Sequence, residues 1–186
     1  MEEGADMASL DQAIRERYAG NYAVMFTDLA GFSRGVTEFG IIHFLQVIFE
    51  SQRILADSLA RHRAELVMTE SDSMLVVFRE PVDALRCSIE MQQVCADYNH
   101  DRDPALQVLL CIGLGYGECL RVGNDDIFGA EVNAASKLGE DIADHGEILM
   151  SGDFYESVKS CPGLVAEALD ICPPGSLKPA YILRKW

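Results

Sequence analysis

Two short β-rich segments, residues 65–69 and 74–78, constrain the fold of this chain more than any other feature. The residues between them, 70–73, are turn formers, so the two segments predict a β-hairpin. Apolar residues recur at helical spacing on both sides of the hairpin, over residues 36–62 and 80–99. A hairpin set between two helices requires neighbouring strands to run antiparallel, which is typical of the α+β class.

Further strands complete a β-α-β-β-α-β order. A compact apolar run at residues 22–27 predicts a buried strand before the first helix, and residues 105–115 predict another after the second helix. The remaining predicted elements are strands at 119–122, 147–151 and 180–183 and helices at 132–144 and 152–160. This order predicts a ferredoxin-like βαββαβ sandwich, with a mainly antiparallel sheet, helices packed on one face, and additional C-terminal strands and helices.

The 186 residues suit one domain, and no repeat, linker or low-complexity tract divides them. Residues 1–20 are polar and helix-permissive, so we expect a leader helix there and one folded domain over 21–186. The N-terminus lacks the basic and apolar regions of a signal peptide, and the longest apolar runs are too short to span a bilayer. We therefore expect a soluble, cytoplasmic protein without a membrane partner.

The formal net charge is −15, from 30 acidic and 15 basic residues. Binding to DNA or RNA needs clustered Lys and Arg that neutralise phosphates, and attachment to anionic lipid has the same requirement. The charge therefore argues against a nucleic-acid partner. An acidic protein that binds a polyanionic nucleotide would need metal cations to mediate the contact.

Two aspartates are the first candidates for a functional site. Asp28 directly follows the first predicted strand, and Asp72 lies at the tip of the predicted hairpin. In a β-α-β-β sheet these two ends meet, and neighbouring carboxylates repel unless a cation lies between them. Oxygen ligands favour Mg²⁺ or Mn²⁺, which enzymes use one or two at a time to displace groups at phosphorus. The alternative is that Asp28 caps a helix and Asp72 closes the turn.

Two further segments carry groups suited to a nucleotide. Gly31, Phe32 and Ser33 lie directly before the first long helix, where free backbone N–H groups bind phosphate oxygens. Asn133 and Lys137, four residues apart on one predicted helical face, offer an amide and an ammonium to a ribose or to charge developing on a phosphate. The alternative for this pair is a solvated helix face.

Taken together, these segments resemble the class III nucleotidyl cyclases, the catalytic domain shared by many adenylate and guanylate cyclases. The resemblance extends over about residues 20–186 and rests on the order and spacing of several motifs. The matching segments are VMFTDLAGFS (24–33), VMTESDSMLVVF (67–78), IGLGYGE (112–118), DIFGAEVNAASKL (126–138) and GEILMS (146–151).

The resemblance implies a role for each candidate. Asp28, Asp72 and the backbone carbonyl of Leu29 would hold two Mg²⁺ or Mn²⁺ ions, Asn133 would orient the ribose, and Asp126 would contact the base. Family members work as head-to-tail dimers, with the metals in one chain and Asn133 and its neighbours in the other. The implied reaction is in-line attack of the ribose 3′-OH on the α-phosphate of a nucleoside triphosphate, which expels pyrophosphate.

Three positions depart from the family pattern. Met68 stands where adenylate cyclases usually carry a base-reading lysine and guanylate cyclases a glutamate, and its side chain cannot donate a conventional hydrogen bond. Ser71 replaces the glycine before the metal aspartate, which is tolerable if the turn avoids positive φ. Lys137 replaces an arginine that steadies the transition state, and the loss of a bidentate contact predicts a rate lower by roughly 10- to 100-fold.

The residues are compatible with more than one substrate base and with more than one level of catalytic activity. Asp126 is an acceptor when ionised and favours a base with an amino group, so ATP is the first expectation. A pyrimidine nucleotide, CTP or UTP, is the second, because Met68 departs from the purine-reading pattern. A catalytically weak pseudo-cyclase that binds nucleotide or forms dimers is favoured by Met68 and Lys137, whereas Asp28 and Asp72 argue against it. A diguanylate cyclase is disfavoured because its Gly-Gly-(Asp/Glu)-Glu-Phe turn is missing at the hairpin.

Overall fold

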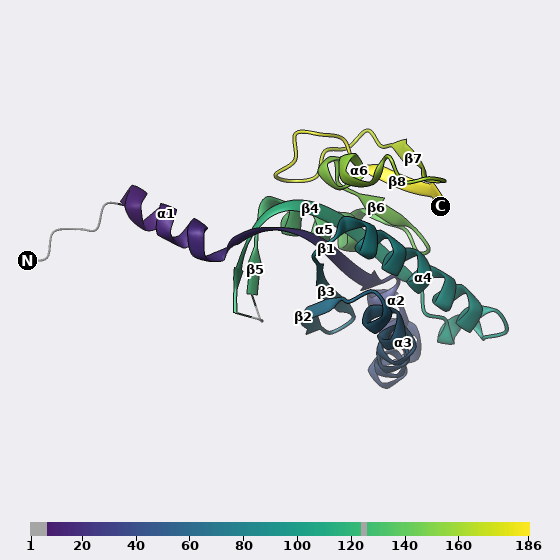
Figure 1. Cartoon of the computed structure of the whole chain (residues 1–186). Coiled ribbons are helices and arrows are strands. Elements are labelled where there is room, and N and C mark those ends of the chain that lie inside the picture. The colour runs from purple at the N-terminus through teal and green to yellow at the C-terminus, as the bar shows by residue number, and fades with distance from the viewer. Residues whose placement is uncertain (1–6, 124–125) are drawn as a thin grey trace, which may run out of the picture.

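The computed structural model of the chain describes residues 7–123 and 126–186, apart from the side chains of residues 32–35 and 66–67 (Figure 1). Within these residues the sheet has the order β2-β3-β1-β4-β6-β8-β7, and β5 pairs with the C-terminal end of β4. The strands are β1 (Ala19–Leu29), β2 (Glu65–Glu70), β3 (Ser73–Phe78), β4 (Leu110–Val122), β5 (Asp126–Phe128), β6 (Ile148–Met150), β7 (Val165–Ala168) and β8 (Tyr181–Lys185).

The helices are α1 (Met7–Tyr18), α2 (Phe32–Phe39), α3 (Ile41–Arg61), α4 (Pro81–Asn99), α5 (Ala130–Ser136) and α6 (Gly152–Val158), with a 3₁₀ turn η1 (Pro104–Leu106) and a π-helix η2 (Lys137–Ile142). Figure 1 shows α1 projecting from the body of the domain, whereas β7, β8 and α6 gather at the end opposite β2 and β3. Among the described residues, no helix is long and apolar enough to cross a membrane.

The part of the sheet that carries the candidate site has the ferredoxin-like order β2-β3-β1-β4. β1 pairs antiparallel with β3 and with β4, and β2 pairs antiparallel with β3. The crossovers are α3, between β1 and β2, and α4, between β3 and β4. These pairings confirm the predicted βαββαβ sandwich with a mainly antiparallel sheet and C-terminal additions; β4 and β6 are parallel.

Helices cover both faces of β1, which corrects the expectation of helices on one face. Ala23 and Met25 belong to the main core with residues of α3 and α4. Tyr22 and Val24 point to the other face, where a smaller core includes Ala135 of α5. The two crossover helices do share one face, but the C-terminal addition brings α5 onto the other. Because strand residues alternate between faces, Asp28 lies on the α5 face with Val24.

Several elements differ from their predicted bounds. The helix expected over 36–62 is divided into α2 and α3 at Gly40, whose φ of 88° lies in the left-handed region that glycine tolerates. The strands expected at 105–115 and 119–122 form one strand, β4, preceded by η1. β5 and β7 were not predicted, because three and four residues are too few to show an alternating pattern.

Glycines allow α5 and η2 to lie directly on the backbone of β1 and β4. A Cβ atom at Gly113 would lie 2.1 Å from the carbonyl oxygen of Ala135, and one at Gly139 would lie 2.7 Å from the carbonyl oxygen of Phe26. Both distances are well below van der Waals contact, so any larger residue would push the helix off the sheet. This close packing fixes η2 beside the end of β1 that carries Asp28.

The buried carboxyl group of Glu131 anchors the start of α5. Its Oε2 accepts hydrogen bonds from the backbone N–H of Tyr116, at 2.9 Å, and from the hydroxyl of Ser151. Burial raises the pKa of this carboxyl, and the hydrogen bonds from Ser151 and Tyr116 oppose the rise. Glu131 thereby ties α5 to β4 and to the N-terminus of α6, two residues before Asn133.

Candidate active site

The structure brings Asp28 and Asp72 to the same end of the sheet. Asp28 is the next-to-last residue of β1, and Asp72 is the second residue of the two-residue turn between β2 and β3. β3 pairs with β1 through Thr27 and Met74, so the turn lies directly beside the end of β1. The hydroxyl of Ser73 donates a hydrogen bond of 2.9 Å to Oδ1 of Asp28 and joins the two segments.

The electrostatics of Asp28 reflect its burial and two neighbouring acids. Its pKa is raised from 3.8 to about 6, mainly by burial and further by the negative charges of Asp72 and Glu140. The hydrogen bond from Ser73 and one from the backbone of Leu29 act in the opposite direction. A divalent cation at this position would favour the ionised form of Asp28 and offset the repulsion between the acids.

An open pocket of about 310 Å³ lies over the hairpin turn, on the α5 face of the sheet. Its described lining combines acidic, hydroxyl and apolar side chains and includes no Lys, Arg or His: Phe26, Met68, Glu70, Ser71, Asp72, Ser73, Leu75 and Glu140. The acids come from β2, the turn after it and η2, and the apolar side chains come from β1, β2 and β3. The pocket is therefore suited to cations on its acidic side, with an apolar wall beside them.

The donor set fits ions that arrive with a nucleotide better than a metal caged by protein alone. Within residues 7–123 and 126–186, no three His, Cys, Asp or Glu side chains are placed so that they could enclose one ion. Mg²⁺ is commonly bound by one or two carboxylates together with substrate phosphates and water. Asp28 and Asp72 would be such carboxylates, and the backbone carbonyl of Leu29 is adjacent to Asp28 in β1.

The turn conformation corrects the expectation for Ser71. Its φ is +54°, in the left-handed region, so the condition under which serine would replace glycine without cost is not met. Two-residue hairpin loops favour turns with positive φ at the first central position, because these match the twist of the strands. The register of β2 and β3 thus imposes this conformation on Ser71.

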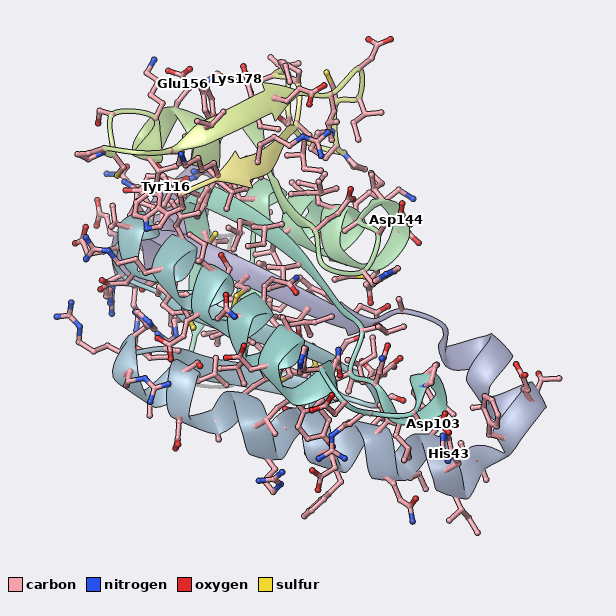
Figure 2. All side chains as sticks on the ribbon, turned by 90° about the vertical axis from the view of Figure 1, so that its right-hand side faces the viewer. His43, Asp103, Tyr116, Asp144, Glu156 and Lys178 are labelled. Atoms are coloured by element: carbon pink, nitrogen blue, oxygen red, sulfur yellow. The ribbon has the colours of Figure 1, made fainter. Side chains whose placement is uncertain are left out.

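The predicted phosphate-binding segment begins at a different pocket from the acidic one. Gly31, with φ of 87°, precedes α2 and has no side-chain cap. Phe32 and Ser33 begin α2, but their side chains are outside the described part of the structure. Gly31 lines a separate pocket of about 370 Å³ on the α3 face, together with His43. Nε2 of His43 is 2.6 Å from the carbonyl oxygen of Ala105, and Figure 2 shows His43 beside Asp103 at this end of the molecule.

Asn133, Lys137 and Asp126 do not line the acidic pocket of their own chain. Asn133 is exposed on α5, and Asp126 is exposed at the start of β5. Lys137 begins η2, where its Nζ lies 2.7 Å from Oδ2 of Asp141. Met68 is 45% exposed on β2 and does line the pocket.

Two residues of this site were not identified from the sequence. Ser73 was read only as a turn residue, although a serine next to a hairpin aspartate could have been considered as its hydrogen-bond partner. Glu140 was expected to be an ordinary helical residue. Its approach to Asp28 and Asp72 depends on the π-helical winding of η2, for which the sequence carries no recognised signal.

Comparison with known proteins identifies the family. Residues 14–172 match the family model described as "Adenylate and Guanylate cyclase catalytic domain", and the chain belongs to this family. A relative from Rhizobium meliloti named "Putative adenylate cyclase 3" is 27% identical over 147 residues, which cover 79% of this chain and 24% of that protein. The chain thus spans about a quarter of the length of this curated relative.

Solved structures of cyclase domains share the fold. An adenylate/guanylate cyclase/hydrolase from Silicibacter pomeroyi superposes with a TM-score of 0.76 at 23% identity, covering 89% of this chain and 96% of that one. The adenylyl cyclase CyaB from P. aeruginosa superposes with a TM-score of 0.72 at 20% identity, covering 90% and 94%. At these identities the similarity concerns the fold.

Proposed function

We propose that this chain is a two-metal nucleotidyl cyclase that converts a nucleoside triphosphate, in the first place ATP, to a 3′,5′-cyclic nucleotide and pyrophosphate. The observation that carries the proposal is that Asp28 and Asp72 meet at one end of the sheet of a cyclase domain, where Asp72 lines an acidic pocket and Ser73, in the same lining, is hydrogen-bonded to Asp28. The ions would be Mg²⁺ or Mn²⁺. When bound, they would favour loss of the 3′-OH proton and neutralise charge on the triphosphate.

Different residues of the chain would bind the metal ions, bind the phosphates, orient the ribose and stabilise the transition state. Asp28 and Asp72 would bind the metal ions at the acidic side of the pocket, and Ser73 fixes the Asp28 carboxylate through its hydrogen bond. The free N–H groups at the start of α2, after Gly31, bind phosphate oxygens. Asn133 orients the ribose so that the 3′-OH faces the α-phosphate, and Lys137 steadies the negative charge that develops there.

A head-to-tail homodimer accounts for the position of Asn133 and Lys137. Both residues lie away from the acidic pocket of their own chain, so they would complete the pocket of a partner copy. The two pockets of the dimer would be equivalent, because each chain provides the metal side of one and the ribose side of the other.

ATP is proposed because Asp126 is an exposed acceptor that matches an amino group on the base, and because the Rhizobium meliloti relative carries the name of an adenylate cyclase. A pyrimidine triphosphate is the second candidate, since Met68 at the pocket offers an apolar contact in place of a purine-reading polar group. A weak pseudo-cyclase is a third, favoured by the ion pair that engages Lys137 with Asp141.

The shared-site proposal is tested by complementation. Asp72→Ala and Asn133→Ala should each abolish formation of cyclic nucleotide, because each removes one side of both pockets. An equimolar mixture, allowed to exchange subunits, should recover about a quarter of wild-type activity, because half of the dimers are mixed and each mixed dimer has one intact pocket. Two inactive variants that stay inactive after demonstrated subunit exchange would rule out the shared site.

A further inference from the structure

Glu140 is placed at the acidic pocket by the winding of η2. The N–H of Ala143 bonds to the carbonyl of Leu138, five residues earlier, as in a π-helix. Gly139 lies so close to β1 that no side chain fits between them. The next residue, Glu140, therefore emerges beside the end of β1 and lines the same pocket as Asp72 and Ser73.

The neighbouring acids of η2 have separate partners. Asp141 pairs with Lys137, at 2.7 Å. Oε2 of Glu140 accepts a hydrogen bond of 2.7 Å from the hydroxyl of Ser136, one turn earlier. Ser136 thus orients the Glu140 carboxylate without neutralising its charge. Among the described residues, the lining of the pocket contains no Lys or Arg that would neutralise it.

We propose that Glu140 is a positioning residue of the metal pocket, whose carboxylate strengthens divalent-ion binding through the water ligands of the ion and not by direct ligation. This inference rests on the proposed metal-dependent function and adds a residue to its site. Asp28 and Asp72 are already the two carboxylates assigned to direct ligation, and no third acid of the described chain is placed so that it could enclose the same ion with them. A charged group beyond the direct ligands still changes metal affinity, through hydrogen bonds to bound water and through its field.

The alternative is a solvated helix residue that serves only to accept the Ser136 bond. Glu140→Gln distinguishes the two, because the amide oxygen keeps that bond and the size of the side chain while the charge is lost. Asp144→Asn provides a matched control. Asp144 is exposed on the loop after η2, as Figure 2 shows, and it does not line the pocket, yet the substitution removes the same charge.

The experiment measures binding of Mn²⁺ alone to the whole chain, from the electron paramagnetic resonance signal of free Mn²⁺, with Asp72→Asn as a reference. Glu140→Gln should weaken Mn²⁺ binding by about 3- to 10-fold, and the effect should shrink at high salt because the carboxylate is exposed. Asp144→Asn should bind as wild type does, and Asp72→Asn should lose most binding.

Two results would overturn the inference in distinguishable ways. If Glu140→Gln binds Mn²⁺ as tightly as Asp144→Asn while Asp72→Asn is impaired, Glu140 has no part in the site and the proposed function stands. If Asp72→Asn binds normally, the metal site itself is misplaced, and the proposed function fails together with the role of Glu140.

Discussion

Oγ of Ser73 lies 2.9 Å from Oδ1 of Asp28, so the first residue of β3 holds the carboxylate at the end of β1. This bond links the hairpin turn, which carries Asp72, to the strand that carries Asp28. The two acids therefore keep a fixed relationship although they are far apart in the sequence. A shift of the hairpin by one residue would move Asp72 and Ser73 together away from Asp28.

Ser73→Ala is expected to weaken the metal dependence of catalysis. A hydrogen bond to a charged group contributes about 1.5–3 kcal/mol, so its loss should raise the Mn²⁺ concentration for half-maximal activity by roughly tenfold or more. Ser73→Thr keeps the hydroxyl and suits a strand, so it should behave nearly as wild type does. Equal metal dependence of the alanine and threonine variants would show that this bond has no role in the site.

Ser71→Gly is expected to stabilise the protein. Ser71 adopts a φ of +54°, which is costly for a residue with a Cβ atom and easy for glycine. The free energy of unfolding in urea should rise by about 0.5–1 kcal/mol, after allowance for the greater freedom of glycine in the unfolded chain. Ser71→Ala serves as the control and should show no gain. A gain of the same size in the alanine variant would mean that the serine hydroxyl, and not backbone strain, is responsible.

Lys137→Arg is expected to accelerate turnover. A guanidinium can contact two phosphate oxygens at once, whereas the Lys137 ammonium acts as a point charge and is paired with Asp141. If the added contact is worth about 1.4–2.7 kcal/mol in the transition state, kcat should rise by roughly 10- to 100-fold. Steady-state rates of cyclic-nucleotide formation measure this. An unchanged or lower kcat would remove Lys137 from the transition-state contacts.

Glu131→Gln is expected to change how stability depends on pH. Burial raises the folded-state pKa of Glu131 above its ordinary value of 4.5, so the folded chain binds this proton more tightly than the unfolded chain does. The Glu131 contribution to stability is therefore largest below pH 4.5 and is lost as the pH rises through the raised pKa. Glutamine cannot ionise, so the variant lacks this loss.

The measurement for Glu131 is urea unfolding of both proteins at steps from pH 4.5 upward. The free energy of unfolding of the variant should increase relative to that of wild type as the pH rises, and then level off. A difference that stays constant over this range would contradict the assigned pKa shift. Comparison of the two proteins at each pH cancels the groups that titrate in both.

The meeting of Asp28 and Asp72 could be predicted from the sequence, because it follows from topology alone. An apolar run ending at Thr27 and a hairpin tip at residues 71–72 must adjoin once the hairpin joins the first strand. The types of the longer helices and strands followed equally from periodicity, whereas β5 and β7 are too short to show it. The break between α2 and α3 did not, since apolar spacing continues through Gly40 and hides the change of direction there.

Other parts of the site depend on tertiary geometry. The positive φ of Ser71 is set by the register of β2 on β3, which no propensity of serine would indicate. Glu140 reaches the pocket because Gly113 and Gly139 let η2 touch the sheet and because η2 is wound as a π-helix. Asn133 is exposed on α5 and does not line the acidic pocket of its own chain, which the helical spacing of Asn133 and Lys137 did not indicate.

Incubation of the protein with ATP, GTP, CTP and UTP, each with Mn²⁺ or Mg²⁺, tests the central claim most directly when the products are resolved by mass. We predict a 3′,5′-cyclic nucleotide and an equal amount of pyrophosphate, with ATP as the best substrate and with no product from Asp72→Ala. A cyclic pyrimidine nucleotide would change the base and leave the metal site in place. No cyclic product from any of the four triphosphates, or undiminished turnover by Asp72→Ala, would contradict the account.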